Sequence, residues 1–211
     1  MSWTRYSRAE LRADLMVHLA GLAFAAVAGP TLIALAWLRA DGATVAAVSV
    51  YAATMLVMLG ASAAYHLSRR PRWRAALRRL DHGAIYLKIA GTYTPFAAIS
   101  MGAGAGPGLL ATVWSVAGAG LALKLFAPMR FERLSVALYL ALGWAGVWVW
   151  SEMEAALSPQ GLWLLAAGGA LYSVGVGFFL WERLPFNNAI WHLMVLIATV
   201  CMFAAVAVEM V

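Results

Sequence analysis

Long, continuous apolar runs are the feature that most constrains how this chain can fold. A helix needs about 20 predominantly apolar residues to cross a hydrocarbon layer of about 30 Å, and seven such runs fit into the sequence without overlap. They cover residues 14–38, 43–66, 82–101, 107–127, 133–150, 161–181 and 188–208. Few residues remain for a soluble domain, so we expect residues 1–211 to form a single membrane domain.

Composition supports the same class. The chain is 64% hydrophobic and 11% charged, whereas soluble domains carry about 25% charged residues. Membrane β-strands alternate polar and apolar residues over about 10 positions, but the runs in this chain are apolar throughout. We therefore predict an all-α, polytopic membrane protein built as a seven-transmembrane-helix bundle.

The positions of arginine and lysine indicate the orientation of the chain in the membrane, because short cytoplasmic loops are enriched in these residues. With a cytoplasmic N-terminus, the inner segments receive Arg5, Arg8, Arg12, Arg69, Arg70, Arg72, Arg74, Arg78, Arg79, Lys124, Arg130, Arg133 and Arg183. The outer loops then receive only Arg39. We expect the N-terminus inside and the C-terminus outside. The net charge of +6 could also suggest nucleic-acid binding, but the orientation signal explains it better.

Polar side chains inside the predicted spans gather near the cytoplasmic edge. They are His18, His66, Asp81, His82, Asn188 and His192. Ionisable groups are costly to bury in a membrane and usually face the bundle interior, where they have partners. Their clustering at one depth predicts a polar site. Taken singly, however, a histidine such as His18 or His82 at a helix end is also typical of an interfacial hydrogen-bonding residue.

Helical spacing narrows the site. Ser62 and His66 are four residues apart, as are Asn188 and His192, so each pair shares a helix face. Imidazole and carboxylate groups bind zinc, and a catalytic zinc site leaves one position for water. A nearby carboxylate can hold that water or act as a general base, and Asp81 is the candidate. Lys88 lies near mid-membrane with no evident partner, which would also suit a proton or ion path.

Four stretches resemble one known family. They are DHGAIYLKIAGTYTPF at residues 81–96, ADLMVHLAGLA at residues 13–23, GASAAYHL at residues 60–67 and FNNAIWHLMVL at residues 186–196. Together they resemble the haemolysin III family, the bacterial branch of the progestin and adipoQ receptor superfamily. The resemblance implies a seven-helix bundle with an inside N-terminus, placed in the bacterial cytoplasmic membrane.

The resemblance also implies a zinc site near the cytoplasmic side. In the receptor members, a histidine on the second helix and two on the seventh bind zinc, and an aspartate on the third helix holds a zinc-bound water. Ser62, His66, Asp81 and His192 match that pattern, but Asn188 stands where the first seventh-helix histidine is expected. The implied metal residues are therefore His66, His192 and Asn188, and the implied catalytic residues are Asp81 and Ser62.

An asparagine oxygen is a harder and weaker zinc donor than imidazole, so the missing histidine leaves three alternatives. A displaced ligand such as His18 or His82 could replace it, His66 and His192 could bind zinc with Asp81, or the chain could bind no metal. The sequence does not choose among them.

The superfamily is related to membrane hydrolases such as alkaline ceramidases. The resemblance therefore implies a metal-dependent hydrolase of lipid amides or esters, with membrane lipids as partners and possible substrates. Two alternatives remain: a non-catalytic ligand-binding or regulatory protein with a degenerate zinc site, and a pore-forming or lytic protein. We expect no nucleic-acid partner.

Overall fold

The computed structural model describes residues 6–68, 70–126 and 132–211, and the secondary structure of these residues is helical throughout. The elements are α1 (Arg8–Arg39), α2 (Gly42–Leu67), α3 (Pro71–Pro95), η2 (Phe96–Ser100), α4 (Gly106–Phe126), α5 (Glu132–Gly143), η3 (Ala145–Val149), α6 (Trp150–Ala156), α7 (Pro159–Leu180) and α8 (Asn187–Met210). The predicted all-α class is therefore confirmed. Arg5, Arg69 and Arg130, which entered the charge argument, lie outside the described residues.

Local sequence explains where the long helices begin. Ser7 and Glu10 form a capping box at the start of α1, in which each side chain accepts a hydrogen bond from the other residue's backbone N–H. Asp41 caps α2 through the Thr44 N–H, and Ser158 caps α7. Proline occupies the first position of α3 and of α7, where its missing N–H removes no helical hydrogen bond.

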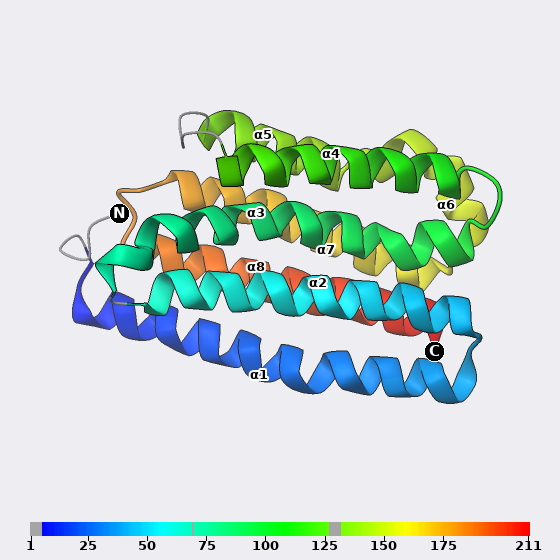
Figure 1. Ribbon diagram of the computed structural model, residues 1–211, viewed down its shortest axis with the longest axis horizontal. Helices are drawn as coiled ribbons and strands as arrows, with labels where there is room; N and C mark the ends of the chain where they lie inside the picture. The colour runs from blue at the N-terminus through cyan, green and yellow to red at the C-terminus, as the bar shows by residue number, and fades with distance from the viewer. Residues whose placement is uncertain (1–5, 69, 127–131) are drawn as a thin grey trace.

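The long helices lie side by side in one elongated bundle (Figure 1). Helices that follow one another pack together in the series α1–α2–α3–α4, and α8 packs between α7 and α1. Tyr51 and Met55 of α2, Leu32 of α1 and Val206 of α8 belong to one buried apolar cluster. A second cluster joins α3, α4 and α5. The core thus places α1, α2 and α8 against one another.

Within the described residues, six segments are long and apolar enough to cross a membrane: Arg8–Arg39, Gly42–Leu67, Gly106–Phe126, Leu134–Ala156, Pro159–Leu180 and Asn187–Met210. A polytopic membrane protein is therefore the right class. α3 is not among the six, although it packs between α2 and α4. The seventh span at residues 82–101 stays a prediction.

α3 begins at Pro71, well before the predicted span at residue 82. The arginine-rich segment from Arg72 to Arg79 is therefore helical and continuous with that predicted span. Alanine, leucine and arginine all favour helix, so nothing in this segment breaks it. The predicted span at residues 133–150 is instead interrupted, because α5, η3 and α6 share that path.

One end of the bundle collects several helix termini. α1, α3 and α8 begin there, and α2, α4 and α7 end there (Figure 1). The basic residues assigned to the cytoplasmic side belong to segments at this end wherever they are described. α8 ends at the opposite end of the bundle (Figure 1).

Candidate metal centre

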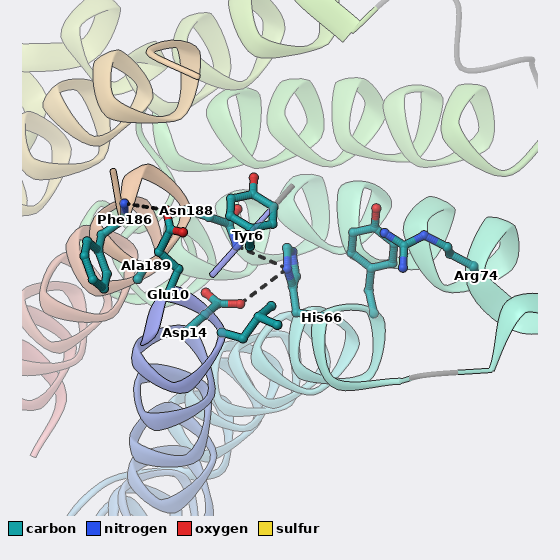
Figure 2. Close-up of a pocket in the computed structure, with 10 residues that line it drawn as sticks. Tyr6, Glu10, Asp14, His66, Arg74, Phe186, Asn188 and Ala189 are labelled. Carbon is teal, nitrogen blue, oxygen red and sulfur yellow. Dashed lines mark hydrogen bonds and ion pairs between the residues drawn. The ribbon is translucent and has the colours of Figure 1, made fainter. Parts of the chain in front are cut away.

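α1, α2 and α8 bring polar side chains together at the end where α1 begins. Asp14 and His18 lie near the start of α1, His66 lies in the last turn of α2, and His192 lies in the second turn of α8. A pocket opens at this end, and Asp14, His66 and Asn188 are among the residues that line it (Figure 2). Side chains that are distant in the sequence therefore share one small volume.

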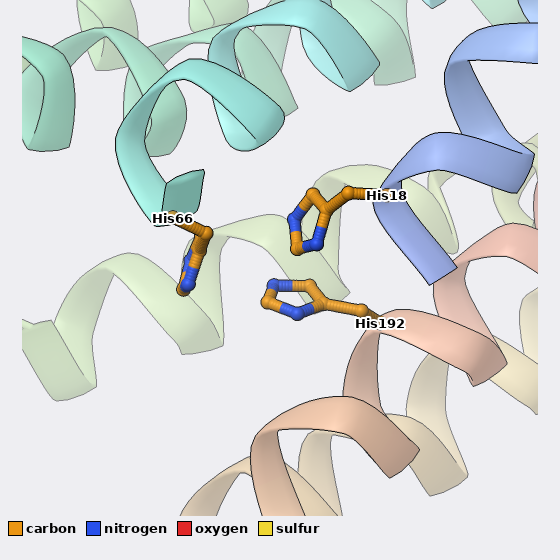
Figure 3. Close-up of side chains that lie close together, drawn as sticks. All are labelled: His18, His66 and His192. Atoms are coloured by element: carbon orange, nitrogen blue, oxygen red, sulfur yellow. The ribbon is translucent and has the colours of Figure 1, made fainter. Parts of the chain in front are cut away.

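Three imidazole rings face one another next to this pocket (Figure 3). His18, His66 and His192 each offer a ring nitrogen, and these nitrogens lie within 4.8 Å of one another. The ring centroids are 4.4 Å apart for His18 and His192, 4.4 Å for His66 and His192, and 5.1 Å for His18 and His66. The two histidines implied by the resemblance are thus neighbours, and His18 lies against both.

Asp14 is the carboxylate closest to the three rings. Its Oδ1 lies 2.6 Å from Nδ1 of His192 and 3.7 Å from Nδ1 of His18. Its Oδ2 lies 3.6 Å from Nδ1 of His66. Only 7% of Asp14 is exposed. A carboxylate that is nearly removed from solvent must be compensated by partners, and the imidazoles are in place to do this.

Ser62 and Asp81 lie on another side of the rings. Oδ2 of Asp81 is 3.9 Å from Nε2 of His66, and the Ser62 side chain lies beside this carboxylate. Oγ of Ser62 is also 3.4 Å from Nε2 of His18. The two residues predicted to be catalytic therefore lie next to the histidines and not between them.

Asn188 and His82 occupy different places around the centre. The Asn188 side-chain nitrogen lies 3.4 Å from Nδ1 of His66, so its amide borders one ring of the cluster. Nε2 of His82 lies 4.0 Å from Oδ2 of Asp81, and His82 is not part of the three-histidine group. Of the two displaced ligands considered, His18 is the one beside His66 and His192.

The donor set fits a zinc ion. Zinc–nitrogen bonds of about 2.0–2.1 Å in a tetrahedral site place ligand nitrogens roughly 3.3 Å apart, so nitrogens that now lie within 4.8 Å of one another need to close by at most about 1.5 Å. Three imidazoles with an open fourth position are an established donor set for catalytic zinc. A carboxylate hydrogen-bonded to a ligand histidine is equally common around such sites. Asp14 supplies that carboxylate.

Asp14 was missed by reasoning from the sequence, although a signal existed. Asp14 and His18 are four residues apart on α1, the same spacing that singled out Ser62 with His66. Nδ1 of His18 donates a hydrogen bond to the Asp14 backbone carbonyl at 2.8 Å. The missing information was the rotation of α1, which decides whether this face meets α2 and α8 or faces outward.

Two residues that line the pocket, Glu10 and Phe186, join distant segments of the chain. Oε1 of Glu10 accepts a hydrogen bond from the Phe186 N–H at 2.9 Å (Figure 2). Phe186 has a left-handed backbone with φ of 60° and directly precedes α8. This contact joins the start of α1 to the start of α8, the two helices that carry His18 and His192.

Comparisons with known proteins agree with the sequence motifs. The family described as "Haemolysin-III related" matches residues 11–203. "Hemolysin-3" of Bacillus cereus is 39% identical over 203 residues, which cover 96% of this chain and 92% of the relative. "Hemolysin-3 homolog" of Bacillus subtilis (strain 168) is 39% identical over 158 residues, covering 75% and 74% of the two chains.

A human protein shows a weaker likeness. "Monocyte to macrophage differentiation factor" of Homo sapiens is 28% identical over 127 residues, which cover 60% of this chain and 52% of the relative. The bacterial matches, by contrast, extend over most of both chains, and the family match includes all four histidines and Asp14. The chain therefore belongs to the haemolysin-III-related family of membrane proteins.

Proposed function

We propose that this protein is a zinc-dependent hydrolase of lipid amides or esters. The observation that carries the proposal is the convergence of His18, His66 and His192 within 4.8 Å, with Asp81 3.9 Å from His66. In this proposal His18 takes the ligand position that Asn188 does not fill. Three imidazoles would then bind the metal and leave Asp81 and Ser62 for proton transfer and orientation.

Bound zinc would supply Lewis-acid activation of water at neutral pH. The carboxylate of Asp81 would accept a proton from the attacking water while the water oxygen forms a bond to the substrate carbonyl carbon. Asp81 would then return that proton to the leaving amine or alcohol as the C–N or C–O bond breaks. The products are a carboxylic acid and an amine or alcohol, so all atoms are accounted for. The Ser62 hydroxyl, which lies beside Asp81, would donate a hydrogen bond that holds this carboxylate in place.

An apolar pocket beside the histidines supports a lipid substrate. His18, Ser62 and His192 line it together with Val17, Gly21, Met58, Leu59, Val195 and Leu196. Hydrocarbon would suit these walls, because apolar side chains gain nothing from a polar ligand. His66 lines the pocket at the bundle end, and His18 and His192 line this one, so both pockets reach the histidine cluster, where a substrate carbonyl would need to lie.

The location of the chain belongs to the same proposal. Residues 1–211 would form one membrane domain with α3 as a seventh span, the N-terminus in the cytoplasm and the C-terminus outside. The histidines would then lie near the cytoplasmic face of the bacterial inner membrane. Membrane lipids would be the partners, with the arginines of α3 facing anionic headgroups.

Metal content is the first test. We expect purified protein in detergent to contain about one zinc per chain by elemental mass spectrometry. His18→Ala, His66→Ala and His192→Ala should each lose it, whereas His82→Ala, the matched control, should retain it. Adding Asn188→His to His18→Ala should restore zinc, because residue 188 borders His66. Protein that binds no zinc, or His66→Ala that retains full metal, would refute the proposal.

Catalysis is tested separately by release of free fatty acid from long-chain acyl amides and lipid esters in mixed micelles. Asp81→Asn should retain zinc and lose the activity, with kcat reduced by about 10²-fold or more, the typical contribution of a general base. Activity unchanged in Asp81→Asn would remove this residue from the mechanism.

A regulatory protein without catalysis is the second candidate, and Asn188 is the observation that favours it. A protein that has lost one histidine of the superfamily pattern could keep the fold and bind ligand without hydrolysis. With its degenerate zinc site, this candidate predicts that wild-type protein releases no fatty acid from any of the lipids tested, whether or not it binds zinc.

A further inference from the structure

Asp14 has an unusual position for a carboxylate. It lies on the buried face of α1 with 7% of its surface exposed. Among the described residues, its ion-pair partners are the imidazoles of His18, His66 and His192. Each approaches through Nδ1. One residue therefore contacts the same ring atom of every member of the cluster.

The contacts fix the hydrogen positions on two of the rings. Nδ1 of His192 lies 2.6 Å from the Asp14 carboxylate, and an ionised carboxylate can only accept a hydrogen bond. Nδ1 of His18 lies 2.8 Å from the Asp14 backbone carbonyl, which is also only an acceptor. Both Nδ1 atoms must therefore carry hydrogen, and in the neutral rings both Nε2 atoms keep their lone pairs.

His66 has two groups at the corresponding atom. Its Nδ1 lies 3.6 Å from Oδ2 of Asp14 and 3.4 Å from the side-chain nitrogen of Asn188. Rotating the Asn188 amide by half a turn exchanges its oxygen and nitrogen, and the oxygen would then accept a hydrogen bond from Nδ1. Asn188 is thereby placed to orient His66, which explains a neutral amide at this position without making it a metal ligand.

We propose that Asp14 is the positioning residue of the histidine centre, and that Asn188 helps Asp14 to orient the ring of His66. Asp14 holds His18 through its backbone and His192 through its carboxylate, so that both rings present Nε2 to the metal. This inference rests on the proposed zinc binding. It adds that metal affinity depends on a residue of α1 that does not itself bind the metal.

The carboxylate contributes more than shape. A carboxylate that accepts the other N–H of a ligand histidine makes the coordinating nitrogen more basic, and losing such a partner typically costs 10–100-fold in metal affinity. An asparagine at residue 14 keeps the size and the hydrogen bond but removes the negative charge. The backbone carbonyl that holds His18 is unaffected by this change.

The first experiment measures zinc affinity in Asp14→Asn by competition with a chromogenic chelator in detergent. We expect zinc to bind about 10–100-fold more weakly than to wild-type protein. Asp41→Asn is the matched control, because it makes the same change at the N-cap of α2, where asparagine also caps well. Its zinc affinity should equal that of the wild type. Equal affinity in Asp14→Asn and wild type would overturn the inference.

Two outcomes separate this inference from the proposed function. Wild-type protein that binds no zinc refutes both, whereas wild-type protein that binds zinc with Asp14→Asn unaffected refutes only the role of Asp14. Cobalt-loaded protein gives a second signal, since loosened imidazoles should weaken or shift the visible bands of a tetrahedral site in Asp14→Asn and leave them unchanged in Asp41→Asn. Identical spectra in all three proteins would contradict the inference.

A measurement on the wild type does not depend on the folding of any variant. The chain has four histidines, so nitrogen-15 NMR of histidine-labelled, metal-free protein can assign the tautomer of each ring. We expect His18 and His192 to carry hydrogen on Nδ1. Finding hydrogen on Nε2 and none on Nδ1 of His192 would overturn the inference, because the Asp14 carboxylate could not then be its acceptor.

Discussion

Lys88 lies buried in α3 with 4% of its surface exposed. Its ammonium donates a hydrogen bond to Oγ1 of Thr92 at 2.7 Å and lies 4.2 Å from the ring centroid of Tyr51. Thr92 also donates to the Lys88 backbone carbonyl at 2.8 Å. The partners of Lys88, which the sequence did not reveal, are therefore a hydroxyl and the face of an aromatic ring. Neither partner is an anion.

Lys88→Met tests whether this buried ammonium destabilises the folded protein. Methionine keeps the length of the side chain and leaves Thr92 bonded to the backbone, so no buried polar group loses its only partner. Because a buried charge without an ionic partner is costly, we expect thermal unfolding to shift upward by about 2–4 °C, the change that roughly 1 kcal/mol gives in a chain of this size. The measurement is the unfolding midpoint in detergent.

Lys124→Met is a second variant for comparison, because Lys124 is also buried with 4% of its surface exposed. Lys124 lies in the last turn of α4, where a positive charge interacts favourably with the helix dipole, so its midpoint should rise less than that of Lys88→Met. A large fall in the midpoint of Lys88→Met would instead show that the ammonium has an essential partner, as an ion path would require.

At the scale of the helices, α2 and α3 approach closely where a glycine lacks a side chain. A Cβ atom at Gly91 would overlap the Thr54 hydroxyl and lie 2.8 Å from its Cβ. That hydroxyl is held by hydrogen bonds to the Val50 and Tyr51 carbonyls, each at 3.0 Å. The side chain is therefore not free to move aside, and the contact sets the distance between the helices.

Gly91→Ala should accordingly push α2 and α3 apart. Overpacking of this kind costs about 1–3 kcal/mol, which we expect as a lower unfolding midpoint. The control is Gly60→Ala on α2, where a new Cβ would meet nothing within 4 Å and where alanine favours helix more than glycine. If Gly91→Ala were as stable as Gly60→Ala, the close approach of the two helices would not be a constraint.

The helix pair also carries part of the site. Ser62 and His66 lie near the end of α2, and Asp81 lies on α3. A shift between these helices would change the 3.9 Å separation of His66 and Asp81. We therefore expect Gly91→Ala to lower fatty-acid release more than it lowers zinc content, since the three histidines come from α1, α2 and α8.

For the whole molecule, the asymmetry of positive charge predicts the orientation in the membrane. With an odd number of spans and an inside N-terminus, the C-terminus should lie outside the cytoplasm. Fusions after Val211 test this in a bacterial host. Alkaline phosphatase fused there should be active, because it folds only outside, and green fluorescent protein exported by the same route should be dark.

A fusion at the other terminus serves as the control. Green fluorescent protein placed before Met1 should fluoresce. Bright fluorescence from both termini would mean an even number of crossings, and the six apolar segments would then be the complete set without α3.

The sequence by itself determined the helical class, most helix boundaries and the family. These depend on short-range information. An apolar run must satisfy its own backbone hydrogen bonds in lipid and so becomes helical, while caps such as Ser7 and Asp41 act within one turn. Six of the seven predicted spans coincide with apolar segments of sufficient length. α3 departs from this rule because its arginines and Asp81 lower its hydropathy.

Only the tertiary structure decided which polar residues meet. Spacing on one helix shows that His66 lies on the face of Ser62, but it cannot show how α1 is rotated against α2 and α8. Packing of Leu32, Tyr51 and Val206 in one core settles that rotation and turns Asp14 and His18 inward. In the proposed zinc site, residue 18 would supply the ligand that residue 188 lacks, because metal-binding geometry depends on distance between side chains and not on their order along the chain.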